Sequence, residues 1–166
     1  LVMTALDKSR RVTAAGLFLR DQEGTGFDQI GAIGEGVPAR IEVATARMLL
    51  ERLEQSSVLL ENVAEEVRSR GSSGRRFEAG EAILTAAEVL GSLKAGVLVA
   101  IRDEQHEIVG LLALDDQRAR DAISPEEIGL VEQLATQIGV VIENSRSYQQ
   151  MKERDRLALL GQMAAG

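Results

Sequence analysis

The amino-acid sequence predicts an α+β fold in which helices flank an antiparallel β-sheet and a long coiled-coil helix forms the C-terminal end. Two pairs of apolar, β-rich runs indicate this sheet, because each pair is joined by a short polar turn and predicts a hairpin, at 14–35 and 96–116. Segments with helical spacing of apolar residues separate the hairpins. No proline follows Pro125, so one helix can continue from there to the end of the chain.

The composition fits one domain built around an aliphatic core. The chain has 166 residues, of which 45% are hydrophobic and 2% aromatic, so leucine, isoleucine, valine and alanine must fill the interior. The net charge of -7 opposes contact with phosphate backbones and anionic membranes, so we expect no nucleic acid and no direct membrane contact. The absence of cysteine excludes disulfides, thiol catalysis and zinc–thiolate sites, and it fits the cytoplasmic location that we expect.

The first half of the chain is predicted to place short helices around the first hairpin. Residues 1–12 have the spacing of the end of an amphipathic helix. Pro38 suits the first position of a helix, and the apolar spacing predicts that this helix covers 39–55. The stretch "SSVLLENV" at 56–63 is a candidate for a short strand.

The middle of the chain leads into the second hairpin. The stretch "RSRGSSGRR" at 68–76 predicts a glycine- and serine-rich loop with four arginines. A helix is expected at 80–96, with Gly96 placed to close it. The second hairpin has the apolar density of strands at the centre of a sheet, where we expect it.

The C-terminal helix carries the signals of a capped start and of a partner helix. Ser124 is the expected N-cap, Pro125 takes the first helical position and Glu127 can complete a capping box. Apolar residues then recur at heptad spacing, which predicts a parallel homodimer. The predicted interface residues are Ile128, Val131, Ala135, Ile138, Ile142, Leu159 and Met163. Alternatively, the first five of them face the chain's own sheet.

The segment 96–148 resembles the C-terminal half of a GAF domain. That family has a hairpin ending in a Gly-Leu-Leu-type strand, a Ser-x-Glu-Glu helix start and an Ile-Glu-Asn-x-x-x-Tyr helix. The matching residues are Gly110, Ser124, Glu126, Glu127, Ile142, Glu143, Asn144 and Tyr148. The upstream hairpin fits the first two strands of the family, so residues 1–148 are expected to form a GAF-like sensory domain.

The tail "KERDRLALLGQMAAG" resembles the start of the dimerisation helix of sensor histidine kinases. In that family this segment leads into the H-box, which carries the phosphoacceptor histidine. Residues 149–166 are therefore expected to be a helical linker and the start of that helix, within a longer protein.

Together the two resemblances imply a sensory domain of a two-component histidine kinase. It would sense a small ligand or partner and signal through a dimeric helix to the kinase core, which acts on a response regulator. This chain would not itself be an enzyme, whereas its parent would be an ATP-dependent protein-histidine kinase. The alternative is a GAF module that binds no ligand and instead dimerises or docks a partner protein.

The candidate ligand-binding residues are Arg75 and Arg76, in the arginine-rich loop. Resembling GAF domains often bind a small molecule, sometimes a cyclic nucleotide, and arginine can hold a phosphate by bidentate bonds. The expected site lies on the sheet face opposite the long helix, covered by residues 56–95. The competing interpretation of this loop is a disordered surface segment.

No catalytic or metal-binding constellation is predicted, and no cofactor is evident apart from such a ligand. His106 is the only histidine and lies in a polar turn without a second ligand nearby, so we expect a solvated turn residue. The acidic pairs are interpreted as strand-end, helix-surface or capping residues: Asp115/Asp116, Glu65/Glu66 and Glu126/Glu127.

Overall fold

A six-stranded antiparallel sheet forms the centre of the computed structural model, which describes residues 12–69, 75–94, 96–115 and 123–165. Its strands are β1 (Ala14–Arg20), β2 (Gly26–Ile33), β3 (Arg40–Glu42), β4 (Val58–Leu59), β5 (Val97–Arg102) and β6 (Ile108–Asp115). They are ordered β3-β2-β1-β6-β5-β4, with every neighbouring pair antiparallel. Both predicted hairpins are present, and the second supplies the central strand β6, as predicted.

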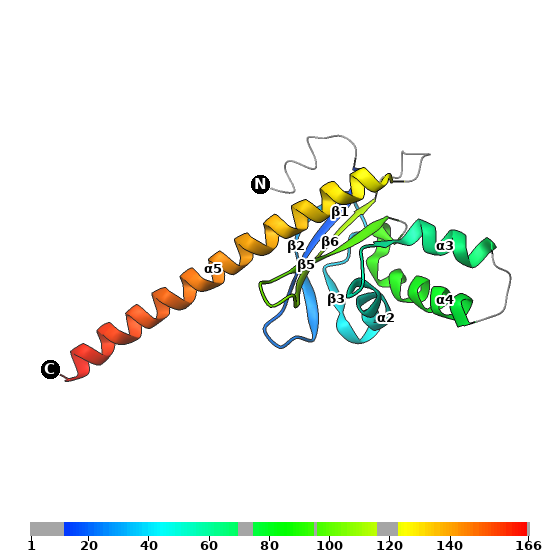
Figure 1. The fold of residues 1–166 in the computed structure, drawn as a ribbon. Helices are drawn as coiled ribbons and strands as arrows, with labels where there is room; N and C mark the ends of the chain where they lie inside the picture. Colours follow the sequence, from blue (N-terminus) through cyan, green and yellow to red (C-terminus); the bar gives the residue numbers. More distant parts are fainter. Residues whose placement is uncertain (1–11, 70–74, 95, 116–122, 166) are drawn as a thin grey trace.

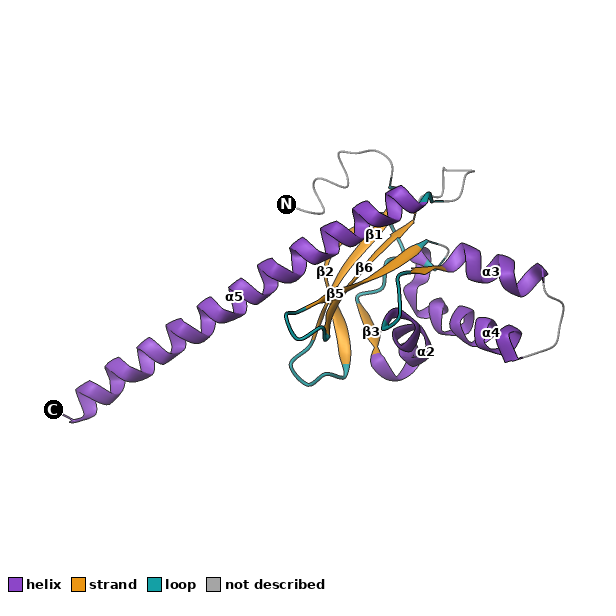
Figure 2. Cartoon of the chain, viewed as in Figure 1, coloured by secondary structure: helices purple, strands orange, loops and turns teal. Residues whose placement is uncertain are grey.

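Helices cover both faces of the sheet. They are α2 (Val43–Leu53), α3 (Leu60–Ser69), α4 (Arg75–Ala87), the 3-10 helix η1 (Glu88–Leu93) and α5 (Pro125–Ala165). Figure 1 shows α5 lying along one face and running far beyond the sheet, while α2, α3 and α4 gather on the other side. Figure 2 shows the strands enclosed between these two layers of helix. The predicted α+β class and the long C-terminal helix are therefore confirmed.

Two apolar clusters, one on each face of the sheet, form the core. Successive side chains of a strand point to opposite faces, so β5 sends Leu98 toward α2 and α4, and Val99 and Ile101 toward α5. All eight residues of β6 are buried, as expected for a strand covered on both sides. The rings of Phe18 and Phe27 lie in the cluster under α2, which is otherwise aliphatic.

The helix predicted at 39–55 begins later, at Val43, because the preceding residues form strand β3. Ile41 is fully buried and lies opposite Phe27 of β2, while Arg40 and Glu42 face solvent to a greater degree. This alternation is that of an edge strand with one buried face. The helix predicted at 39–55 was therefore wrong for the first residues of that segment.

Helix α3 was not predicted. Its two ends were assigned to the short strand at 56–63 and to the loop at 68–76, and residues 64–67 to no element. The strand stops at Leu59 after two residues. Val63 and Val67 then lie on the side of α3 that meets α4, where a Cβ at Gly80 would come within 2.6 Å of the Val67 side chain. The missing side chain at Gly80 thus permits the close approach of the two helices.

The helix predicted at 80–96 also differs from the structure. It starts at Arg75, passes into η1 and is interrupted at Gly91, whose φ of 60° is natural only for glycine. Gly96 lies beyond the last residue of η1, Leu93, and its N–H donates to the Leu93 carbonyl oxygen at 3.2 Å. A Cβ there would lie 1.8 Å from the Leu114 carbonyl oxygen, so Gly96 also serves the close contact with β6. The helix predicted at 1–12 falls almost wholly outside the described residues.

The start of α5 has the predicted capping box. The Ser124 N–H donates to Glu127 Oε2 at 2.9 Å, and the Glu127 N–H donates back to Ser124 Oγ at 3.3 Å. These reciprocal bonds satisfy donors that a helix start otherwise leaves free. From this cap α5 continues without a break for 41 residues.

The first half of α5 packs on the sheet through small and aliphatic residues. Ala135, Ile138 and Gly139 are buried against the cluster that contains Val99 and Ile101. A Cβ at Gly139 would lie 2.3 Å from the Arg102 carbonyl oxygen. The helix therefore reaches the backbone of β5 at a point where no larger residue fits.

Replacing Gly139 with alanine should destabilise the fold, because the new methyl group would overlap a backbone atom of β5. We expect the free energy of unfolding to fall by about 1–3 kcal/mol, as measured by urea denaturation.

Gly129→Ala on the same helix is the matched control. A Cβ at Gly129 meets no atom within 4 Å, so only helix propensity changes. Alanine should raise the free energy of unfolding by about 0.5–1 kcal/mol there. Similar effects of the two substitutions would contradict the close contact at Gly139.

Candidate functional site

The predicted ligand-binding arginines lie at the ends of helices rather than in a loop. Arg75 is the first residue of α4 and is exposed, and Arg68 is exposed in the last turn of α3. Arg76 belongs to α4, but its side chain, like residue Arg70, lies outside what the structure describes. Arg75 lines none of the three grooves considered below.

The sheet face on which a ligand was expected is filled by side chains. Leu98, Leu111 and Ala113 of the sheet meet Leu49, Leu90 and other apolar residues of α2, α4 and η1 in one buried cluster. In the described part of the chain, these residues fill the space where the ligand was predicted with a packed apolar core. A cyclic nucleotide held by Arg75 and Arg76 stays a prediction.

A groove of about 720 Å³ lies between α5, the β5–β6 turn and the segment that joins α2 to β4. We call it the β5-edge groove, because Val99, Ala100 and Arg102 of β5 form part of its lining. Strand β4 pairs only with Val97 and Leu98. Among the described residues, the outer edge of β5 from Val99 to Arg102 therefore has no strand partner.

The β5-edge groove is strongly acidic. It is lined by five carboxylates and one guanidinium: Glu54, Asp103, Glu104, Glu132, Glu143 and Arg102. None of the five carboxylates forms an ion pair with another described residue. Asp103 accepts the backbone N–H groups of Gln105 and Glu107, and Glu132 accepts the hydroxyl of Ser57. The groove thus presents a negative field with little internal compensation.

Arg102 holds the walls of this groove together. Its Nη2 donates to the Leu53 carbonyl oxygen at 2.7 Å, and its Nη1 donates to the His106 carbonyl oxygen at 2.9 Å. One side chain thus links the end of α2 to the β5–β6 turn. Arg102 could not be singled out from the sequence, because an arginine at the end of a strand gives no local sign of such contacts.

Two further grooves are smaller. One of about 500 Å³ lies between α2, α3 and α4. The other, of about 410 Å³, lies between β1, α2 and the β5–β6 turn, and carries three arginines and three glutamates: Arg20, Arg47, Arg102, Glu51, Glu54 and Glu107. Its opposite charges balance, so it offers no net field to a charged ligand.

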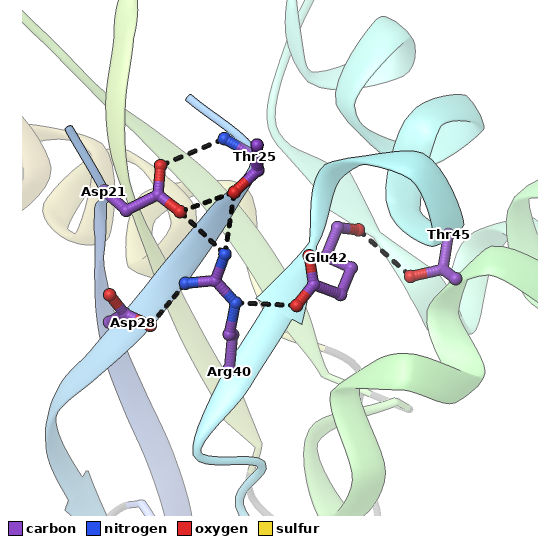
Figure 3. A network of polar contacts seen from close by, with 6 residues as sticks. All are labelled: Asp21, Thr25, Asp28, Arg40, Glu42 and Thr45. Atoms are coloured by element: carbon purple, nitrogen blue, oxygen red, sulfur yellow. Dashed lines mark hydrogen bonds and ion pairs between the residues drawn. The ribbon is translucent and has the colours of Figure 1, made fainter. Parts of the chain in front are cut away.

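A cluster of ionic contacts surrounds Arg40 at the other end of the sheet, and Figure 3 shows it. Arg40 contacts Asp21 at 2.6 Å through Nη2, Asp28 at 2.7 Å through Nη1 and Glu42 at 2.6 Å through Nε. Nη2 also donates to the Thr25 hydroxyl at 2.9 Å. Because each guanidinium nitrogen already has a partner, we interpret Arg40 as a clamp that fastens β3 to β2 and to the β1–β2 turn.

This clamp shifts the acid–base equilibria of its members. The Arg40 guanidinium is the largest influence on Asp21, and the pKa of that carboxyl is lowered from 3.8 to about 2. The pKa of Arg40 is raised above its ordinary value, first by Glu42 and then by Asp28 and Asp21. Both shifts favour the charged forms that hold β3 in place.

The predicted dimer-interface residues divide into two groups. Ala135 and Ile138 are buried against the chain's own sheet, with Val131 and Ile142 packed beside them, while Ile128 is half-buried. Leu159 and Met163 are 62% and 80% exposed. The alternative interpretation, in which the first five predicted residues face the chain's own sheet, therefore holds for four of them. The homodimer stays a prediction.

A different face of α5 is apolar and exposed. It is formed by Leu130, Val141, Tyr148 and Leu159, which are each between 60% and 65% exposed. They are 11, 7 and 11 residues apart, which is close to whole numbers of helical turns. We call this the exposed apolar face of α5.

Of the remaining candidates, His106 is exposed in the β5–β6 turn, where it lines the β5-edge groove and the groove beside β1. Asp115 is buried at the end of β6, while Asp116 lies outside the described residues. Over the ranges that the structure describes, no three histidine, aspartate or glutamate side chains lie close enough to hold a metal ion. No helix in those ranges has the length and apolarity to cross a membrane.

Comparison with known proteins gives one family and a set of similar folds. The GAF domain model matches residues 2–142. Residues 122 to 287 of a methyl-accepting chemotaxis protein superpose with a TM-score of 0.60 at 14% identity, over 86% of this chain and 84% of that one. No curated protein sequence matches the chain.

Two further solved structures have similar folds. The GAF domain of an Acinetobacter phosphoenolpyruvate-protein phosphotransferase gives a TM-score of 0.59 at 13% identity, over 88% of this chain and 80% of that one. The corresponding domain from Coxiella burnetii gives 0.57 at 17% identity, over 90% and 82%. At such low identities the likeness concerns the fold alone.

The clamp predicts an acid-sensitive contribution to stability. Because the pKa of Asp21 is lower in the folded chain than its ordinary value of 3.8, its contribution is complete above about pH 4 and is lost as the pH falls toward 2. Asp21→Asn should therefore lower stability at neutral pH and flatten the loss of stability between pH 4 and 2.

Urea denaturation across this pH range measures the effect. Glu23→Gln, in the same turn but without an ion pair to any described residue, is the control and should leave the acid profile unchanged. Parallel acid profiles of Asp21→Asn and the unmodified chain would show that the contact with Arg40 adds nothing to stability.

Proposed function

The chain belongs to the GAF domain family, and we propose that it is the sensory and regulatory domain of a two-component histidine kinase. GAF domains are regulatory rather than catalytic, and this chain accordingly acts on a kinase core instead of carrying out a reaction. The observation that carries the proposal is the continuity of α5. One uninterrupted helix contributes to the packed core of the domain and also extends well beyond it.

The two halves of α5 have different surroundings. Up to Ile142 the helix contacts the sheet, whereas every residue from Asn144 to Ala165 is exposed. The exposed half is about 33 Å long at 1.5 Å per residue. A small tilt or rotation of the packed half is therefore carried to the far end, as expected of an element that transmits a signal.

The kinase assignment is supported by the resemblance of residues 152–166 to the start of the histidine kinase dimerisation helix. On this proposal α5 leads into the helix that bears the phosphoacceptor histidine. Repacking of the GAF domain then repositions that histidine relative to the ATP-binding domain, and the response regulator receives the phosphoryl group.

Two copies of the chain pair through the exposed apolar face of α5 in this proposal. Ile138 and its neighbours are already used by the chain's own sheet, so they are replaced as interface residues by Leu130, Val141 and Tyr148. Leu159 remains from the sequence-based set. Pairing would bury side chains that otherwise expose more than half their area.

A second candidate function is a GAF module that docks or dimerises without a small ligand. The filled core between the sheet and α2 and α4 favours it, because a ligand there would have to displace packed leucines. On this candidate the signal still leaves the domain through α5. Only the signal that the domain receives differs, because it would come from a protein partner and not from a small ligand.

The dimer is tested by sedimentation equilibrium on the 166-residue chain. Val141→Asp combined with Tyr148→Asp should convert a dimer into a monomer, because two carboxylates would face their copies across an apolar contact. Gln150→Asp, exposed on another side of the helix, should leave the dimer intact. A wild-type chain that remains monomeric at high micromolar concentration would exclude this interface.

The kinase assignment predicts where phosphate appears. The 166-residue chain should take up no phosphate from ATP, whereas the parent protein should autophosphorylate on a histidine in the segment that follows Gly166. In the parent, His106→Ala should leave the labelling unchanged, because His106 lies in the exposed β5–β6 turn and not on a helix. Phosphate located on His106 by mass spectrometry would refute the assignment.

A further inference from the structure

The open edge of β5 offers backbone hydrogen bonds that the described residues do not use. Gly96 C=O accepts the Leu60 N–H on the β4 side of the sheet. Backbone groups of a strand alternate between its two sides, so Leu98 and Ala100 also point to that side. Leu98 meets β4, but β4 ends before Ala100. The N–H and C=O of Ala100 therefore face the β5-edge groove.

An unpaired strand edge is a template for a further strand. Proteins commonly protect such an edge with a bulge, a proline or a covering element, or use it to bind an extended peptide through main-chain bonds. Here the edge lines a groove of about 720 Å³, together with α5 and the α2–β4 segment. A groove between elements favours a single extended chain over a flat protein surface.

The charge of the groove determines the kind of chain that fits. Five carboxylates face one guanidinium, and Arg102 already donates to two backbone carbonyl oxygens. An acidic segment would be repelled, whereas lysine or arginine side chains would find carboxylates without ion-pair partners.

We propose that the β5-edge groove binds an extended, lysine- or arginine-bearing segment of a partner protein, which adds to the sheet as a strand beside β5. Main-chain bonds to Ala100 supply the pairing, and Glu132 and Glu143 of α5 select for positive charge. This site is separate from the exposed apolar face of α5 and does not depend on the kinase assignment.

The spacing of the two α5 carboxylates matches such a strand. Glu132 and Glu143 are 11 residues apart, or about 16 Å along the helix axis. Side chains on one face of a strand recur about every 6.8 Å, so residues i and i+4 of the bound segment are about 14 Å apart. The length and flexibility of lysine side chains cover the difference.

The proposal is tested by fluorescence anisotropy with the 166-residue chain and a labelled, end-blocked peptide of seven residues in which lysine and valine alternate. This peptide should bind, and the matched peptide with glutamate in place of lysine should not. Glu132→Gln combined with Glu143→Gln should weaken binding of the lysine peptide about five- to tenfold, because two ion pairs are lost. Glutamine has nearly the volume of glutamate, and its amide oxygen can still accept the hydrogen bond that the Ser57 hydroxyl donates to Glu132.

Two controls separate strand addition from general attraction between charges. Glu126→Gln combined with Glu153→Gln removes the same charge from the same helix outside the groove, and should change the affinity less than twofold. A lysine peptide N-methylated at every residue keeps its charge but cannot donate main-chain bonds, and should bind at least tenfold more weakly. Amide exchange at Ala100 should slow when the unmodified peptide binds.

Three results would overturn the proposal. The first is failure of the lysine peptide to bind the unmodified chain. The second is an equal loss of affinity in the Glu132/Glu143 variant and in the Glu126/Glu153 control. Binding would then depend on the overall net charge of -7 and not on the groove. The third is equal binding of the N-methylated peptide, which would exclude pairing with β5.

Discussion

The contact between α5 and β5 at Gly139 is the constraint on which the other features of the fold depend. A residue without a side chain lets the helix approach the Arg102 carbonyl oxygen, and the preceding Ala135 and Ile138 are buried in the cluster that contains Val99 and Ile101. The side chain of Arg102 meanwhile fixes the end of α2 and the β5–β6 turn. Three elements from distant parts of the sequence thus meet around one residue, and their meeting forms the β5-edge groove.

The elements that sequence analysis predicted correctly are those specified by their own residues. The hairpins β1–β2 and β5–β6 have polar turns between apolar runs, and the cap of α5 lies within Ser124 to Glu127. Strand β3 and helix α3 were missed because their identity depends on neighbours. Arg40 forms part of a strand because β2 lies alongside it, with Asp28 of β2 and Asp21 of the β1–β2 turn paired to its side chain. Val67 belongs to a helix because α4 leaves room for its side chain at Gly80.

The candidate sites were harder to predict for a related reason. Glu54 follows the end of α2, Arg102 ends β5 and Glu132 lies in α5, and none of them stands in a recognisable motif. The apolar pattern of α5 is ambiguous in a different way, since a helix on a sheet and a helix in a coiled coil need the same spacing. Burial resolves it: Ile138 is covered by β5, while Val141, three residues later, is 63% exposed.

Helix α5 therefore has three distinct sides, and their arrangement links the two proposed contacts. Ile138 points to the sheet, Glu132 lines the groove, and Val141 belongs to the exposed apolar face. Glu132 and Val141 are nine residues, or about two and a half turns, apart, so they project from opposite sides of the helix. A strand bound in the groove contacts the same rigid helix that the second copy contacts from the other side. Any rotation of α5 that improves one contact must alter the other, so the groove provides a physical route by which a protein partner changes the pairing of two chains.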